Sequence, residues 1–250
     1  MRISVIGAQC VGKTTFIQDF LKQWPMYSSP KEKYTDFKKS DKEFSLNEEG
    51  TEDSQRKILN FLVEQIINKK ETDNVILDRS VLDNLVYTMW LNGYDKVENS
   101  FVKETINIVK NTLIFYDIIF FCPITKFSPI ILENEGHRSI NPNYREEIDN
   151  LFKALMKAYY EGNTIYFPLD HELGCPAFIE IFGNREERIE LTKMYIAKDG
   201  KPYGEDQSLL DSELTPEEEA LQQFVENLKS GVRVPNKNII IPKSVSNKRS

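Results

Sequence analysis

The sequence has little of the chemistry that builds metal centres or disulfide frameworks. It contains only three cysteines and two histidines in 250 residues, and Cys10, Cys122 and Cys175 show no Cys-x-x-Cys or Cys/His ligand spacing. Three isolated cysteines suit a reducing cytosol and no disulfide-based fold. Because the N-terminus reads directly as a strand, we also expect no signal peptide and a cytoplasmic protein.

Long apolar runs and an excess of positive charge are missing as well. No run approaches the ~20 residues that a membrane helix needs, so we expect no membrane span. The net charge is −7 and the pI about 5.1, which argues against a general nucleic-acid coat. Nucleic acid therefore remains a possible partner that we do not favour. The Asn-Lys-x-Asp motif of GTPases is absent too, which makes that class of NTPase unlikely.

The informative pattern begins at residue 7, where residues 7–14 read GAQCVGKT and fit the phosphate-loop pattern GxxxxGK[ST]. Residues 2–6 predict a strand before it, and residues 14–21 have the spacing of an amphipathic helix. The glycines let the backbone bend around a phosphate, with its N–H groups pointing inward at the positive end of the helix. We predict that the following residues bind ATP: Gly7, Ala8, Gln9, Cys10, Val11, Gly12, Lys13, Thr14 and Thr15. Lys13 would reach the β- and γ-phosphates, and the Thr14 hydroxyl would hold Mg²⁺.

A second feature is the sequence NVILDRS at residues 74–80. It predicts a buried parallel strand that ends at Asp78, at the sheet edge where ligands gather. Asp78 is a candidate to bind Mg²⁺ through water or to accept a proton from the attacking hydroxyl, and Arg79 to neutralise phosphate charge. The alternative is that Asp78 caps the following helix.

The third feature is a predicted lid at residues 126–145, rich in proline and without helical period, before a helix at 144–160. Arg138 and Arg145 are seven positions apart and could converge on one phosphate, where lid arginines stabilise the transferred phosphoryl group. The alternative for Arg145 is a surface ion pair with Asp149, four residues on.

The remaining pattern alternates strands and helices, which predicts an α/β fold. Helices are expected at 51–67, 80–92, 98–113 and 185–196, and strands at 116–121 and 163–168, with 177–182 either a strand or the entry to the last helix. Residues 202–228 hold eight acidic residues and no basic one, and residues 229–250 hold six basic residues and no acidic one. We therefore expect a domain at 1–200 and an acidic then basic extension at 201–250.

Together these features resemble the P-loop nucleoside and nucleotide kinases. GAQCVGKT matches their phosphate loop, and Asp78-Arg79-Ser80 resembles the element that ends their third strand. Residues 135–138 (EGHR) with 144–149 (YREEID), and also 47–55 and 183–188, resemble a narrower group. That group is the AAA-type ATPase/kinase family related to ribosylnicotinamide kinase, which is frequent in bacteriophage genomes. The resemblance covers about 1–200.

The resemblance implies a three-layer P-loop fold with a five-stranded parallel sheet in order 2-3-1-4-5 and helices on both faces. It implies ATP and Mg²⁺ as cofactors and a nucleoside, nucleotide or related nucleobase-bearing group as the phosphoryl acceptor. For a phage protein it implies a location in the host cytoplasm. The acceptor and the general base stay open, because the Glu-Pro segment of many deoxynucleoside kinases is absent. The alternative function is an NTPase switch read by a protein or nucleic-acid partner.

Three weaker sets of candidate residues concern substrate binding. Glu32 and Lys33 belong to a segment at 26–37 that could contain a short strand. They lie about where such kinases receive the acceptor. The alternative is that they belong to a solvated loop. Gln55, on the first turn of the 51–67 helix capped by Thr51 or Asp53, could read a base edge or face solvent. Asn184 and Arg185 are candidates to contact the adenine of ATP.

Overall fold

A computed structural model describes residues 1–32, 34–70, 72–126, 141–168 and 175–203 of the chain. Residues Met1–Pro202 form one compact unit, and a second unit, Tyr203–Ser250, is described only at Tyr203. Most of the predicted lid, including Arg138, lies outside the described residues, and so does nearly all of the predicted extension at 201–250. The division into a kinase-like domain and an extension stays a prediction.

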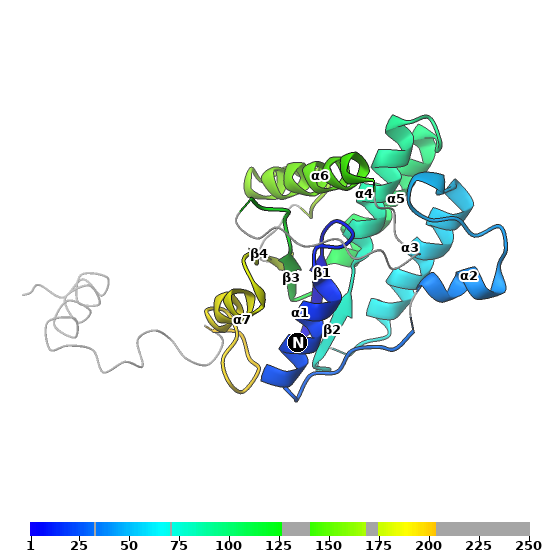
Figure 1. The fold of residues 1–250 in the computed structure, drawn as a ribbon. Coiled ribbons are helices and arrows are strands. Elements are labelled where there is room, and N and C mark those ends of the chain that lie inside the picture. Colours follow the sequence, from blue (N-terminus) through cyan, green and yellow to red (C-terminus); the bar gives the residue numbers. More distant parts are fainter. Residues whose placement is uncertain (33, 71, 127–140, 169–174, 204–250) are drawn as a thin grey trace, which may run out of the picture. The chain divides into compact units, whose positions relative to one another are not determined.

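The centre of the fold is a four-stranded parallel sheet (Figure 1). Its strands are β1 (Arg2–Ile6), β2 (Val75–Asp78), β3 (Ile118–Phe121) and β4 (Ala177–Glu180), in the order β2-β1-β3-β4. The register places Val5 of β1 beside Asp78 of β2 and Phe120 of β3. β1 and β3 are buried along their whole length, as expected for strands of a parallel sheet covered on both faces.

The prediction of five strands is wrong by one strand in the part of the chain that is described. The predicted second strand is reduced to a single parallel bridge between Ser28 and Val75, at the outer edge of β2. Two hydrogen bonds hold it, from Ser28 N–H to the Asn74 carbonyl and from Ile76 N–H to the Ser28 carbonyl. Pro30 follows two residues later and has no N–H to extend the ladder, which explains why pairing stops there.

The predicted strand at 163–168 is also wrong, whereas 177–182 does contain a strand, β4. Residues 163–168 form turns in which the Asn163 side chain accepts a hydrogen bond from the Ile165 N–H, and Ile165 is 60% exposed. A side chain that closes a local turn competes with ladder pairing, so the β-branched pattern at this position was misleading.

The predicted helices are confirmed with small shifts of their ends. They are α1 (Lys13–Gln23), α3 (Glu52–Ile67), α4 (Val81–Gly93), α5 (Asn99–Leu113), α6 (Pro142–Tyr160) and α7 (Arg185–Lys193), with a short α2 (Phe37–Ser40) that was not predicted. α1 packs with α7, and α4 packs with α3, α5 and α6. Among the described helices, none combines the length and the apolar character needed to cross a membrane.

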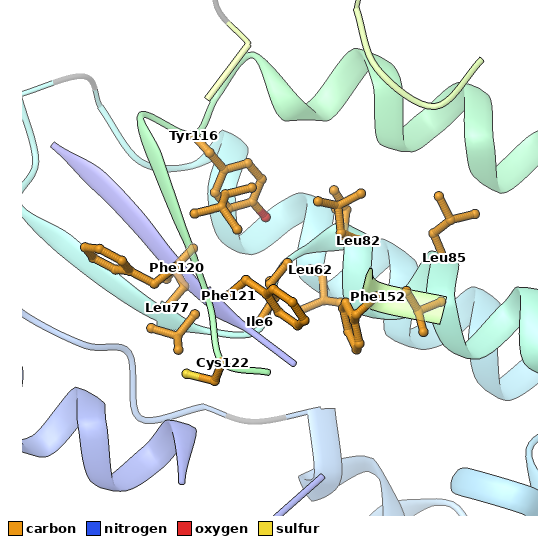
Figure 2. Packing of buried hydrophobic residues seen from close by; sticks show 14 of the residues in the cluster. Ile6, Leu62, Leu77, Leu82, Leu85, Tyr116, Phe120, Phe121, Cys122 and Phe152 are labelled. Atoms are coloured by element: carbon orange, nitrogen blue, oxygen red, sulfur yellow. The ribbon is translucent and has the colours of Figure 1, made fainter. Parts of the chain in front are cut away.

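A single hydrophobic core joins the strands to these helices (Figure 2). Phe121 of β3 stacks on Phe152 of α6 with ring centroids 5.8 Å apart, and Phe120 meets Phe16 of α1 edge-on at 5.7 Å. Figure 2 shows Ile6 and Phe121 of the strands together with Leu62 and Leu82 of the covering helices in this core. Because these side chains are fully enclosed, the carboxyl ends of β1, β2 and β3 are held in fixed relative positions, and the site is built on that edge.

Candidate functional site

The loop between β1 and α1 adopts a conformation that depends on glycine. Gly7 has φ +141°, and a Cβ there would lie 2.6 Å from the Cys122 carbonyl oxygen at the end of β3. Gly12 has φ +84° and is the N-cap of α1, where it offers no side chain to cap the helix. The first N–H groups of α1 are therefore not taken up by a cap and remain available to an anion.

Lys13 is the first residue of α1 and is only 7% exposed. Its Nζ donates to the carbonyl oxygens of Gly7 at 2.7 Å and Ala8 at 2.6 Å, so the ammonium group lies against the loop itself. Burial, reinforced by the positive charge of Arg79, lowers the pKa of Lys13 to about 8, and nearby carboxylates oppose the shift only in part. A phosphate bound in the loop would restore a favourable partner for this charge.

Thr14 and Asp78 meet where α1 begins and β2 ends. The Thr14 hydroxyl donates to Oδ2 of Asp78 at 2.8 Å, although the residues are 64 positions apart. A hydroxyl and a carboxylate are hard oxygen ligands that suit Mg²⁺, which usually binds one or two protein groups together with waters and substrate phosphates. Within the described ranges no group of three or more His, Cys, Asp or Glu side chains is placed to hold a metal ion. The pair therefore fits a metal shared with a nucleotide.

Ser80, and not Asp78, caps helix α4. The Ser80 hydroxyl accepts a hydrogen bond from Leu82 N–H at 3.1 Å, while Oδ2 of Asp83 accepts one from Ser80 N–H at 2.9 Å. These two bonds form a reciprocal capping box. The alternative that Asp78 caps α4 is therefore wrong, and the Asp78 carboxylate is left facing Thr14.

Arg79 lies between two tyrosine rings next to the phosphate loop. Its guanidinium carbon is 5.2 Å from the ring centroids of both Tyr34 and Tyr87, and Nη1 is 3.7 Å from Oδ1 of Asp83. Arg79 has φ +87°, which a non-glycine residue adopts only when the surroundings enforce it. Burial raises the pKa of Asp83 to about 6, with Arg79 acting in the opposite direction. Asp83 is therefore a carboxyl group that is harder to ionise than usual, and it lies beside the Arg79 guanidinium.

A small, partly open pocket lies beside Arg79. Its wall comes from α3, α4 and the segment before them, and consists of Tyr34, Leu46, Asn47, Gln55, Ile58, Leu62, Arg79, Asp83, Asn84 and Tyr87. Gln55 is 2% exposed, so the alternative that it faces solvent is wrong. Glu32 is exposed and lies outside this wall, and Lys33 is outside the described residues. Their roles with the acceptor stay predictions.

Sequence reasoning missed most side chains of this pocket, among them Tyr34, Asn84 and Tyr87. Tyr34 directly follows the predicted acceptor pair, so that segment contained a usable signal. Asn84 and Tyr87 lie on a helix whose apolar spacing indicated only a core position. The available signal was a polar residue within an otherwise apolar helix. Asn84 is such a residue, and in the structure it is 1% exposed.

Two arginines hold the outer carbonyls of the phosphate loop. Arg145 of α6 donates from Nε to the Gln9 carbonyl at 3.0 Å and from Nη2 to the Cys10 carbonyl at 3.2 Å. Arg188 of α7 donates to the Val11 carbonyl at 2.7 Å and was not predicted to take part. The alternative of an ion pair between Arg145 and Asp149 is wrong, because Asp149 accepts from Ile124 N–H and pairs with Lys153. Helices far along the chain therefore fix the shape of the loop.

Asn184 and Arg185 both have partners within the fold. The Asn184 side chain caps α7 by accepting from the N–H groups of Glu186 and Glu187. Arg185 forms a two-point ion pair with Asp19 of α1, at 2.7 and 2.6 Å, which lowers the pKa of Asp19. Contact of Asn184 and Arg185 with an adenine stays a prediction, as does the role of Arg138.

A family model described as an AAA domain matches residues 2–166, which is more than half of the chain. A search of curated proteins finds no match.

Two solved proteins are similar in structure. A deoxyadenosine kinase from M. mycoides, with dCMP and dCDP bound, superimposes with a TM-score of 0.58 at 17% identity over 78% of this chain and 97% of its own. A NadR protein in complex with NR has a TM-score of 0.51 at 16% identity, over 83% of this chain and 53% of its own. At such low identity the likeness shows a shared fold.

Proposed function

This chain belongs to the AAA domain family whose model matches residues 2–166, and from that premise we propose that it is an ATP- and Mg²⁺-dependent phosphotransferase. It would move the γ-phosphoryl group of ATP to a nucleoside, nucleotide or related nucleobase-bearing acceptor. The observation that carries the proposal is the position of Asp78 and Arg79. These consecutive residues face two sites, because Asp78 meets Thr14 of the phosphate loop and Arg79 lines the adjoining pocket.

The donor side would bind ATP through the loop backbone and Lys13. Thr14 and Asp78 would hold Mg²⁺, whose charge lowers the repulsion between phosphate oxygens and an incoming nucleophile. Arg145 and Arg188 keep the loop carbonyls turned outward, which leaves the N–H groups for the phosphates. Phosphoryl transfer needs mainly alignment and charge neutralisation, and these residues supply both.

The acceptor side would be the pocket beside Arg79. It combines aromatic rings with three amides, Asn47, Gln55 and Asn84, a composition suited to a flat heterocycle that carries polar edges. The structures with a shared fold support this proposal, because the M. mycoides enzyme was solved with deoxynucleotides and NadR with NR. Arg79 at the end of the pocket nearest the loop would stabilise negative charge on the group in transfer.

Incubation with ATP labelled at the γ-phosphate tests this proposal. The protein, with Mg²⁺, would be given a panel of nucleosides, nucleotides and DNA, and labelled products separated from free phosphate. We expect label in a nucleoside- or nucleotide-derived product, and none with Lys13→Ala. Hydrolysis without any acceptor-dependent product across the whole panel would contradict the proposal and favour an NTPase switch.

A further inference from the structure

Two buried amide side chains face each other in the wall of the pocket. Gln55 lies on the first turn of α3 and is 2% exposed, and Asn84 lies on α4 and is 1% exposed. Nδ2 of Asn84 donates to the main-chain carbonyl oxygen of Gln55 at 2.9 Å and to its side-chain Oε1 at 2.9 Å. One nitrogen therefore binds both the backbone and the side chain of the same residue.

This arrangement determines the orientation of both amides. The nitrogen and oxygen of an amide are similar in shape, so orientation follows from the partners. A main-chain carbonyl can only accept, so the Asn84 atom that faces the Gln55 carbonyl must be the nitrogen. The same nitrogen meets the Gln55 side chain, so the atom it meets there must be the oxygen. A single backbone carbonyl thus sets the polarity of two side chains.

Two polar groups of this amide pair have no hydrogen-bond partner within the described residues. Oδ1 of Asn84 is buried and has no hydrogen-bond partner, and within the described residues no hydrogen bond takes up Nε2 of Gln55. Residue 50 is a glycine, and a Cβ at that position would lie 3.3 Å from Nε2, so no side chain there covers the amide. A buried acceptor without a partner is unfavourable, which makes a ligand donor the natural complement of Oδ1.

We infer that Asn84 is a positioning residue that locks the amide of Gln55, so that the pocket presents one N–H donor from Gln55 and one carbonyl acceptor from Asn84. The inference rests on the proposed function in taking the bound group to be a nucleobase. The base must carry an acceptor opposite Gln55 and a donor opposite Asn84. Asn84 thereby decides base selectivity partly through another residue's orientation.

Pairs of bases that differ only in this polarity should be told apart. Cytidine has a ring-nitrogen acceptor beside an amino donor, and uridine has a ring N–H donor beside an oxo acceptor. Adenosine and inosine differ in the same way. Since the wrong member leaves buried groups unpaired, we expect wild-type protein to prefer one member of the better-bound pair by ~10-fold or more.

The test is calorimetric binding of these four nucleosides at pH 8 without ATP, together with phosphoryl transfer from labelled ATP. In Asn84→Ala the Gln55 amide is free to turn over, so the preference should fall to within ~3-fold. Gln55→Glu keeps an oxygen for Asn84 Nδ2 but replaces the donor Nε2 by an acceptor, so the preferred member should change. Circular dichroism checks folding, and Gln55→Glu decides the question if Asn84→Ala does not fold.

An unchanged preference in Asn84→Ala or in Gln55→Glu would overturn the inference, and so would failure of the wild type to bind any of the four nucleosides. Binding and transfer separate the inference from the proposed function. Selective binding that is lost in Asn84→Ala, with no transfer by the wild type to any nucleoside, nucleotide or DNA of the panel, would uphold the inference and reject the phosphotransferase. Phosphoryl transfer without selectivity within either pair of nucleosides would uphold the phosphotransferase and reject the inference.

Discussion

At the scale of single residues, Lys13 links ATP binding to pH. Its pKa is lowered from 10.5 to about 8 by burial, so between these values the unfolded chain binds more protons than the folded chain. The contribution of Lys13 to stability therefore rises with pH across that window. A bound phosphate favours the protonated form, so ATP binding near pH 9 should be accompanied by proton uptake.

This uptake can be measured by calorimetry in two buffers of different ionisation enthalpy. We expect the apparent binding enthalpy at pH 9 to depend on the buffer in the sense of proton uptake, because the phosphates of ATP are already fully ionised at that pH and cannot take part in the exchange. Equal enthalpies in both buffers at pH 9 would show that Lys13 does not titrate on binding.

Asp78 offers a test of the metal-binding pair. Asp78→Asn keeps an oxygen that can accept from the Thr14 hydroxyl but removes the negative charge. We expect kcat for phosphoryl transfer to fall by ~10²-fold or more, which corresponds to about 3 kcal/mol of barrier. Asp95→Asn removes an exposed carboxylate outside the pocket and serves as the matched control. A rate within threefold of wild type, roughly 0.65 kcal/mol, would separate Asp78 from catalysis.

At the scale of elements, the first turn of α6 supports the phosphate loop through Arg145. Hydrogen bonds from a charged donor contribute ~1.5–3 kcal/mol, so loss of the two bonds to the Gln9 and Cys10 carbonyls should loosen the loop. We expect Arg145→Ala to weaken ATP binding by ~10-fold, measured by calorimetry. Lys157→Ala on the same helix, an exposed residue with a surface partner, should leave ATP affinity unchanged. Equal ATP affinities of the two variants would show that Arg145 does not support ATP binding.

The capping box of α4 connects the stability of that helix to the site. Ser80→Ala removes the acceptor for Leu82 N–H, and loss of an N-cap costs ~1–2 kcal/mol of unfolding free energy. Glu98→Ala, at the N-cap of α5, is the control, because Glu98 makes no side-chain capping bond. Urea unfolding should therefore show a lower midpoint for Ser80→Ala and a nearly unchanged one for Glu98→Ala. The reverse order would contradict the structure.

At the scale of the whole molecule, residues 194–203 close the unit Met1–Pro202 onto α1. The Trp24 indole N–H donates to the Ala197 carbonyl at 2.7 Å, and the Tyr27 hydroxyl donates to the Gly200 carbonyl at 2.6 Å. Ile196 is 1% exposed. A chain that ends at residue 193 would leave these donors without partners, whereas one that ends at 203 would keep them.

Two truncated chains test this closure. We expect the chain ending at 203 to keep ATP affinity and to unfold at nearly the same urea concentration as the full chain. The chain ending at 193 should lose ~2 kcal/mol or more of unfolding free energy, since each buried donor left unpaired costs ~1–3 kcal/mol. Equal stability of the two truncated chains would mean that residues 194–203 contribute little.

The sequence by itself determined the parts of this protein that depend on neighbours along the chain. The strand, loop and helix at residues 2–21 and the carboxylate at the end of β2 follow from local hydrophobic period and glycine placement. Helix boundaries were nearly right for the same reason. The prediction of a fifth strand was wrong because strand pairing depends on a partner elsewhere in the chain, and near Ser28 only one bridge forms.

Tertiary structure alone decided which distant groups meet. Arg145 reaches the phosphate loop across 136 positions, Arg188 across 177, and Asn84 reaches Gln55 across 29. Each of these side chains lies on a helix whose sequence is compatible with several partners, such as Asp149 for Arg145. The choice among them is made when the helices pack on the sheet, because that packing brings buried polar groups together and leaves them costly to separate.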